Sequence, residues 1–291
     1  MKKIFIYNLY SNNQTITDDK SFKLHQECIK YYKHIFDELV FYLTVDDLNN
    51  KELIKDLTNW VSETCEGSIF TIKVRKNTKL CETETFKNEV WEKRKDYKDC
   101  FVFFAHSKNA TRIKKDLTMN YHPVFNNDII VDSLLKWCVA LYFYSFNFID
   151  EMEKLLYGLP RASEIFYGPL LTQLKDPSVS PMLRMNKGNC FYSGTFYWIN
   201  MNKFNNYIDK GIVDVPLLDD RFWTEMLPGT IGGRFSYGDG CSSHNDVAIN
   251  DDFNLYKMND SEWDYLLSIL GNKHEFYEFY DKMINKINNV S

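Results

Sequence analysis

Short apolar runs alternate with longer amphipathic stretches over the first hundred residues. The runs cover residues 3–10, 38–44, 68–74 and 101–105, and they are rich in the β-branched and aromatic residues typical of strands. The stretches between them, 20–39, 46–65 and 82–95, carry apolar residues at helical spacing. This β-α-β-α-β-α-β order predicts a parallel, doubly wound sheet with right-handed crossovers.

The run Phe101-Val-Phe-Phe-Ala105 is the strongest strand signal in the chain. It is short, uncharged and flanked by polar segments, which predicts a central strand buried on both faces. The chain leaves it through His106, Ser107 and Lys108. Ligands of open α/β sheets bind beyond the carboxyl ends of the strands, so His106 and Lys108 are candidate site residues. The alternative is that they are ordinary polar residues at the end of a core strand.

The second half gives weaker signals. Its pattern predicts a helix over 128–156, an irregular segment over 167–187 and a strand over 190–200 that is interrupted at Ser193-Gly194. Short helices over 201–211 and 222–227 are predicted next, followed by a glycine-rich loop over 229–245. The C-terminal part, 261–288, is predicted to be helix broken near Gly271. No repeat and no clean linker divides the chain. We therefore expect a single domain over residues 1–291.

Composition and charge narrow the classes of function. The chain is 44% hydrophobic and 16% aromatic, which suffices for a large core. Its net charge of −5 argues against a general nucleic-acid binder, because such a protein needs a basic face. The basic stretches 71–76 and 111–115 could still line a pocket for a phosphorylated small molecule, or they could be solvated faces.

Cysteine usage and hydropathy predict a cytosolic protein. The seven cysteines are odd in number and lack metal-ligand spacing, so we expect reduced thiols. We expect no signal peptide, because the N-terminal apolar run is too short. The longest charge-free apolar stretch, 137–149, is too short to span a bilayer. It predicts a buried helix, and the alternative is a helix that meets a membrane surface or a partner.

Two segments suggest carbohydrate chemistry, although the motifs of dinucleotide, P-loop, zinc-protease and serine-hydrolase sites are absent from the sequence. Aromatic residues surround Ser-Gly-Thr in residues 191–198, which suits stacking of a sugar ring, although the segment by itself favours a core strand with a bulge at Gly194. Arg221 and Glu225 have i, i+4 spacing after Asp219-Asp220. They form a surface ion pair or a carboxylate held near a pocket, where a general base for a sugar hydroxyl would lie.

Four blocks, in order over about residues 1–235, resemble a group of bacterial and viral polysaccharide glycosyltransferases of GT-A type. The blocks are Ile4-Phe-Ile-Tyr-Asn-Leu-Tyr10 with the helix after it, Lys76-Asn77 with Glu82, Glu84 and Phe86, Phe103-Phe-Ala-His-Ser-Lys108, and Ser193-Gly-Thr-Phe-Tyr-Trp-Ile-Asn200 with Arg221-Phe-Trp-Thr-Glu225. The third block is similar to the family's Tyr-x-His-Thr/Ser-Lys-Gly motif.

The resemblance implies a GT-A-like (Rossmann-like), mostly parallel α/β sheet flanked by helices, with a C-terminal helical extension. It implies a hexosyltransferase, or a related enzyme, that moves a sugar from a nucleotide-diphosphate donor to a glycan or lipid-linked glycan. Residues 1–125 would form the nucleotide-sugar half, 126–250 the donor-sugar and acceptor half, and 251–291 the C-terminal helices. Such an enzyme of polysaccharide biosynthesis would be cytoplasmic, with peripheral association at the inner face of a membrane.

The resemblance also assigns residues. Glu225 is the first candidate for the general base of an inverting enzyme, and Asp220 is the second. The candidate donor-binding residues are Tyr7, Asn77, His106, Ser107, Lys108, Ser193, Gly194, Trp198 and Arg221. Residues 7–11 and the Asn77 region would lie near the base and ribose.

Two departures from the family pattern bear on the cofactor. Asn109 stands where the family has Gly, and His106-Ser107-Lys108 occupies the place where many GT-A enzymes carry a metal-binding Asp-x-Asp. We therefore expect little dependence on metal, with Lys108 and His106 near the donor phosphates. The alternative is a Mn²⁺ or Mg²⁺ ion held by Asp219, Asp220 or His244.

Two other classes of function remain as alternatives. The chain could be a non-catalytic protein that binds carbohydrate or nucleotide sugar on a degenerate transferase fold, which the missing Asp-x-Asp favours. It could also be a nucleotide-using enzyme of different chemistry on the same kind of sheet.

Overall fold

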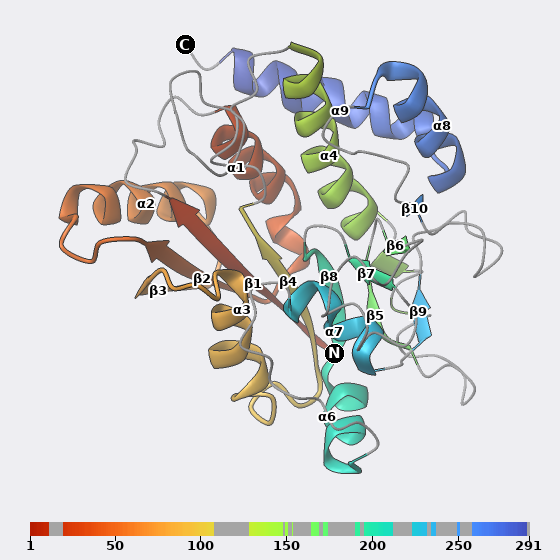
Figure 1. Ribbon diagram of the computed structural model, residues 1–291. Helices are drawn as coiled ribbons and strands as arrows, with labels where there is room; N and C mark the ends of the chain where they lie inside the picture. The colour runs from red at the N-terminus through yellow and green to blue at the C-terminus, as the bar shows by residue number, and fades with distance from the viewer. Residues whose placement is uncertain are drawn as a thin grey trace.

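The computed structural model describes residues 1–11, 20–107, 128–147, 149–150, 153, 164–168, 171–173, 190–192, 195–211, 223–231, 234–236, 249–250 and 258–289. These residues form a mixed α/β fold in which helices cover both faces of a mostly parallel seven-stranded sheet (Figure 1). The predicted fold class is therefore confirmed.

The central sheet has the strand order β3-β2-β1-β4-β8-β5-β9. Its strands are β1 (Lys2–Ser11), β2 (Glu38–Val45), β3 (Phe70–Lys76), β4 (Cys100–His106), β5 (Glu164–Tyr167), β8 (Tyr197–Asn200) and β9 (Arg234–Ser236). The first four strands are mutually parallel, as predicted, and β8 runs antiparallel to both of its neighbours. A small second sheet contains β10 (Ile249–Asn250), β6 (Leu171–Gln173) and β7 (Cys190–Tyr192).

The bounds of the first two helices are set by a capping residue and by the start of the next strand. Helix α1 (Lys20–Tyr32) gives way to the 3-10 turn η2 (Lys33–Ile35), earlier than the predicted end at residue 39, because β2 already begins at Glu38. Helix α2 (Lys51–Thr64) begins after Asn50, whose side chain accepts a hydrogen bond from the backbone N–H of Leu53 at 3.1 Å. The predicted start at residue 46 was therefore too early.

The segment after β3 is helical in two short pieces. Helix α3 (Glu82–Thr85) continues into the π-helical turn η3 (Phe86–Trp91). π-Helical turns are rare and often lie at functional sites. The predicted helix over 82–95 was correct in its start and too long at its end.

The second half contains α4 (Asp128–Phe146), α6 (Met201–Asp209), α7 (Trp223–Ile231), α8 (Asp260–Leu270) and α9 (Lys273–Asn288). The break between α8 and α9 falls at Gly271 with φ of 81°, which confirms the predicted interruption. Strands β5, β6 and β9 were not predicted, because runs of three or four residues show no readable period. The single strand predicted over 190–200 is two strands, β7 and β8, in different sheets.

Helix α4 is buried along most of its length, and the prediction of a buried helix for this apolar stretch is confirmed. Residues from Trp137 to Phe146 have almost no exposed surface. Within the described residues we find no helix that combines the length and hydropathy needed to cross a bilayer. The described cysteine side chains, Cys28, Cys65, Cys81, Cys100 and Cys138, are free thiols, as expected.

Two hydrophobic cores lie on opposite faces of the sheet. The larger one packs α1, α2, α4, α8 and α9 against one face, and the smaller one packs η3, α6 and α7 against the other (Figure 1). Strand β4 separates them, with Phe103 in the first core and Phe104 in the second. Both residues are fully buried, which confirms that this strand is central.

Replacing Phe103 with Ala is expected to lower the free energy of unfolding by about 4 kcal/mol. The ring of Phe103 lies 4.6 Å from that of Phe146 and 5.1 Å from that of Trp198, measured between centroids, so truncation leaves a cavity at the middle of the sheet. Urea unfolding measures the change. Ile69→Ala is the control, since Ile69 is 73% exposed and its truncation should cost less than about 0.5 kcal/mol. Equal effects of the two variants would contradict this packing.

Candidate functional site

The strand order reverses between β1 and β4, and the carboxyl ends of these strands form the edge where ligands bind in open α/β sheets. Hydrogen bonds join the two strand ends. The N–H of Ser107 donates to the carbonyl of Asn8 at 3.0 Å, and the N–H of Tyr10 donates to Oγ of Ser107 at 3.0 Å. The position of His106, which precedes Ser107, is therefore fixed relative to β1.

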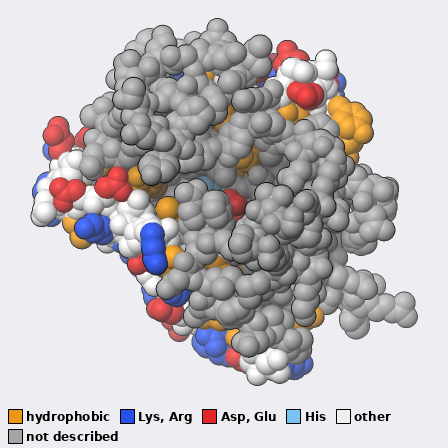
Figure 2. Space-filling view, viewed as in Figure 1, with side chains coloured by type: hydrophobic (Ala, Val, Ile, Leu, Met, Phe, Trp, Pro, Cys, Tyr) orange, Lys and Arg blue, Asp and Glu red, His pale blue; other side chains and the backbone are white. Residues whose placement is uncertain are grey.

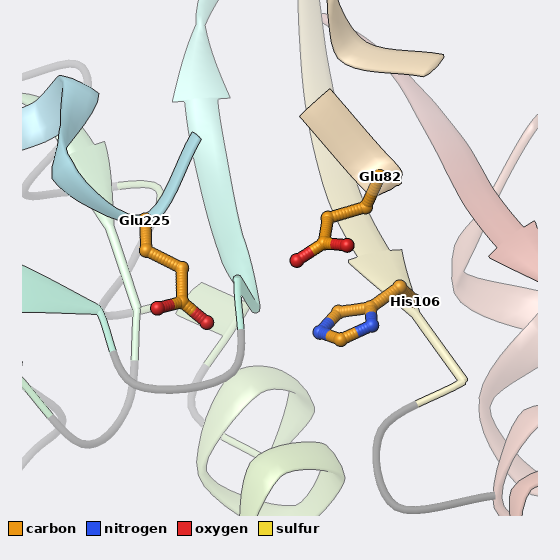
Figure 3. A group of neighbouring side chains, drawn as sticks. All are labelled: Glu82, His106 and Glu225. Atoms are coloured by element: carbon orange, nitrogen blue, oxygen red, sulfur yellow. The ribbon is translucent and has the colours of Figure 1, made fainter. Parts of the chain in front are cut away.

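Three side chains converge at this edge, and we call them the Glu-His-Glu cluster: Glu82 at the start of α3, His106 at the end of β4 and Glu225 in the first turn of α7. One carboxylate oxygen of each Glu and one ring nitrogen of His106 lie within 4.8 Å of one another (Figure 3). Glu225 is buried and the other two are partly exposed. Figure 2 shows a histidine beside an acidic side chain in a hollow near the middle of one face.

Buried contacts beside the cluster hold its two carboxylates in place. The hydroxyls of Thr83 and Thr224, which are the chain neighbours of Glu82 and Glu225, lie 3.3 Å apart. The hydroxyl of Tyr197 donates to the carbonyl of Thr224 at 3.0 Å. Burial raises the pKa of Tyr197 well above its usual value, and the charges of Glu225 and Glu82 raise it further, so this phenol stays a donor.

Thr195 lies just before β8, two residues ahead of Tyr197. The ring of the next residue, Phe196, lies 6.3 Å from that of His106, measured between centroids. Thr195 is buried and has a φ of 54°, a conformation that costs energy for a β-branched residue. Its Oγ1 has no hydrogen-bond partner among the residues that the structure describes. Such strain and an unsatisfied hydroxyl are typical of functional sites.

A second group, which we call the Asp46 cluster, lies at the carboxyl ends of β1, β2 and β3. The hydroxyl of Tyr10 donates to Oδ2 of Asp46 at 3.2 Å, and Nδ2 of Asn77 donates to Oδ1 of Asp46 at 3.0 Å. Burial and the Asp46 charge raise the pKa of Tyr10. The buried Oδ1 of Asn77 has no hydrogen-bond partner within the described part of the chain. The cluster therefore offers a carboxylate, an amide and a phenol ring to a polar, planar ligand.

A buried network around Arg75 lies under this edge and holds the start of α3. Its guanidinium donates to Oδ1 of Asn8 at 3.2 Å, to Oγ1 of Thr85 at 2.9 Å and to the carboxylate of Glu84 at 3.0 Å. It also donates to the carbonyl of Cys81, the residue before Glu82. Burial lowers the pKa of Arg75 and the Glu84 charge opposes this effect. The network fixes the backbone from which Glu82 projects.

Among the predicted site residues, the structure brings His106 and Glu225 together. Ser107 lies beside them, but its hydroxyl bonds to the backbone of Tyr10 and so positions the strand ends. Asn77 belongs to the Asp46 cluster, at the ends of β2 and β3.

Tyr7 and Trp198 lie in the larger core, on the face covered by α1 and α4, and do not join these residues. The Tyr7 hydroxyl lies 2.9 Å from Nδ1 of His25, and Nε1 of Trp198 donates to the carbonyl of Ser145 at 2.9 Å. Neither side chain has exposed surface. Alternation along a strand explains the difference, because both residues point to the face opposite the Glu-His-Glu cluster. Within residues 7–11, the side chain of Tyr10 joins the Asp46 cluster.

The remaining predicted site residues fall outside the described part of the chain. They are Lys108, Ser193, Gly194, Asp220 and Arg221, and the alternative metal ligands Asp219 and His244 fall there too.

Sequence reasoning assigned no chemistry to Glu82 or Asp46, and it included Tyr10 only within residues 7–11, which it placed near the base and ribose. Asp46 lies two residues after the strand predicted over 38–44, so the rule that selected His106 could have found it. Glu82 was noted only as part of a block and not as a site residue. Its pairing with Glu225 is a long-range contact that no local pattern reveals.

Comparisons with known proteins add little to this description. No protein-family model matches the chain, and no curated protein matches it. Among solved structures, the apo form of mouse xyloside xylosyltransferase 1 aligns over 88% of this chain and 94% of its own, with 11% identity and a TM-score of 0.33. At this level of likeness the function has to be argued from the site itself.

Proposed function

We propose that this protein is a glycosyltransferase that moves a sugar from a nucleotide-diphosphate donor to a glycan or lipid-linked glycan. One observation carries the proposal. The Asp46 cluster and the Glu-His-Glu cluster lie at the same carboxyl edge of the sheet, on either side of β1, where a nucleotide-bound substrate of an α/β protein binds.

The Asp46 cluster would bind the nucleoside. A carboxylate has about four lone-pair directions, so Asp46 can accept from a ribose hydroxyl while it keeps its bonds to Tyr10 and Asn77. The ring of Tyr10 offers a face for the base, and Oδ1 of Asn77 offers an acceptor. This assignment belongs to the proposed nucleotide half, residues 1–125.

The donor diphosphate would lie between the two clusters, beside His106 and the following Lys108. The sugar would lie beside the Glu-His-Glu cluster. In the reaction, an acceptor hydroxyl forms a bond to the anomeric carbon, the bond from that carbon to the diphosphate oxygen breaks, and the acceptor's proton passes to a base. Glu225 and Asp220 are the proposed bases, and Ser193, Gly194 and Arg221 complete the proposed donor pocket.

Thermal shift with UDP-, GDP- and TDP-sugars and with the free nucleotides tests the proposal. We expect one nucleotide sugar to stabilise the protein, by about 2.7 kcal/mol at a hundred times its Kd. Asp46→Asn should abolish this shift, because a neutral amide is a weaker acceptor for the ribose. Asp47→Asn is the control, since Asp47 is the exposed neighbour.

Three outcomes would contradict the proposal. Stabilisation by a nucleotide sugar without transfer to any acceptor would favour a binding protein. Equal stabilisation by the free nucleotide, without transfer of the sugar, would favour a nucleotide-using enzyme of other chemistry. Absence of any shift would exclude the nucleotide site.

A further inference from the structure

We infer that Glu82, His106 and Glu225 bind one divalent transition-metal cation of the Mn²⁺ class. The site itself is argued from the side chains that form it. Its role toward the donor phosphates rests on the proposed function.

The donor set fits such a cation. Two carboxylate oxygens and one imidazole nitrogen converge from three separate segments of the chain. Carboxylates suit Mg²⁺, Ca²⁺ and Mn²⁺, whereas imidazole suits first-row transition metals, so the mixed set favours Mn²⁺ over Mg²⁺ or Ca²⁺. Ligand atoms bound at about 2.1 Å lie at most about 4.2 Å apart. The observed separations, all within 4.8 Å, therefore need only small rotations of the side chains to close.

The charge of the cluster also favours a cation. Glu225 is 9% exposed and lies within a few ångströms of a second carboxylate. Two like charges in a partly buried site repel each other, and a bound cation removes the repulsion.

Thr195 provides a separate observation at the same place. Its hydroxyl is buried and unpartnered within the described residues, its backbone is strained, and its chain neighbour Phe196 has its ring 6.3 Å from that of His106. A water on the cation, or an oxygen of a ligand bound to it, would give this hydroxyl a partner. The hydrogen bond between Thr83 and Thr224 keeps both carboxylates in position before any ligand arrives.

The inference changes two expectations from the sequence. A cation at this site replaces the metal-independent arrangement around Lys108, and its ligands differ from Asp219, Asp220 and His244. Glu225 would then contribute an oxygen to the cation, so the role of general base passes to the second candidate, Asp220. Three protein ligands leave coordination positions open, and oxygens of a donor diphosphate would suit them.

Mn²⁺ binding to the metal-free protein, without any nucleotide, tests the inference. The protein is stripped with EDTA, desalted and titrated with MnCl₂, and the signal of free Mn²⁺ is followed by electron paramagnetic resonance. We expect one ion per chain and, for each of Glu82→Gln, His106→Gln and Glu225→Gln, at least about a ten-fold weaker affinity. Glu92→Gln is the control, because this carboxylate is exposed and lies ten residues after Glu82. Its affinity should be unchanged.

Thermal stability gives a second readout if a variant is poorly folded. Mn²⁺ should raise the Tm of the wild-type protein and of Glu92→Gln, and it should not raise that of the three ligand variants. Absence of stoichiometric Mn²⁺ binding, or equal affinity in all variants, would overturn the inference. The nucleotide panel separates the two proposals: stabilisation by a nucleotide sugar without Mn²⁺ binding defeats only the cation site, and Mn²⁺ binding without a nucleotide effect defeats only the proposed function.

Discussion

Glu225→Gln is expected to lower kcat for sugar transfer by about a thousand-fold while the protein stays folded. Glu225 lies in the first turn of α7, beside His106 and Glu82. The substitution keeps the shape of the side chain but removes its negative charge. It therefore weakens cation binding if Glu225 is a ligand, and it removes the proton acceptor if Glu225 is the base. The measurement is transfer from the donor that the nucleotide panel selects, together with circular dichroism of the variant.

The metal dependence of this variant separates the two roles of Glu225. If Glu225 is a ligand, excess Mn²⁺ should restore part of the lost rate, because the remaining ligands still bind the ion weakly. If it is the base, Mn²⁺ should have no effect, and the acid limb of the pH–rate profile, where the rate falls as the base becomes protonated, should disappear. Glu278→Gln is the control, since Glu278 is exposed on α9. An unchanged kcat for Glu225→Gln would exclude both roles.

Glu89→Gln is expected to lower the free energy of unfolding by about 3 kcal/mol. Glu89 lies in the π-helical turn η3, is 2% exposed and accepts hydrogen bonds from four groups. The ammonium groups of Lys73 and Lys93 lie 2.6 and 2.8 Å from its carboxylate, and the hydroxyls of Tyr42 and Tyr97 also donate to it. A glutamine side chain keeps part of this hydrogen-bond geometry but lacks the negative charge that pairs with both lysines.

The pKa of Glu89 predicts that the free energy of unfolding falls at acid pH. Burial acts to raise the pKa of Glu89, but the hydrogen bonds from Lys73, Lys93, Tyr42 and Tyr97 outweigh it and lower the pKa to about 2. A carboxyl whose pKa is lowered by folding stabilises the protein above its unfolded pKa, and this contribution is lost as the pH falls towards the folded pKa. We therefore expect the wild-type protein to lose about 2 kcal/mol between about pH 5 and pH 2 that Glu89→Gln does not lose.

Urea unfolding at several pH values measures both effects of Glu89. Glu92→Gln is the control, because this carboxylate lies on the same segment but is exposed. It should change the free energy of unfolding by less than about 0.5 kcal/mol at any pH. Parallel pH profiles for the wild-type protein and Glu89→Gln would show that the buried ion cluster does not contribute in this way.

The sequence by itself determined the framework of the protein. The alternation of apolar runs with helical spacing specified β1 to β4 and their parallel order, because each apolar run needs a covered face and each crossover supplies a helix. It also selected His106, since a polar residue directly after a buried strand must lie at the edge where ligands bind. These inferences depend only on residues close together in the chain.

The tertiary structure alone decided which side chains share a site. Tyr7 and Trp198 have the residue types expected around a nucleotide sugar, yet the register of β1 and β8 turns both into the larger core. Glu82 and Glu225 come from distant helices, and the pairing of β8 with β4, together with the contact between Thr83 and Thr224, brings them to His106. The physical reason is that the face of a strand and the approach of remote helices are set by burial over the whole sheet, which local sequence patterns do not encode.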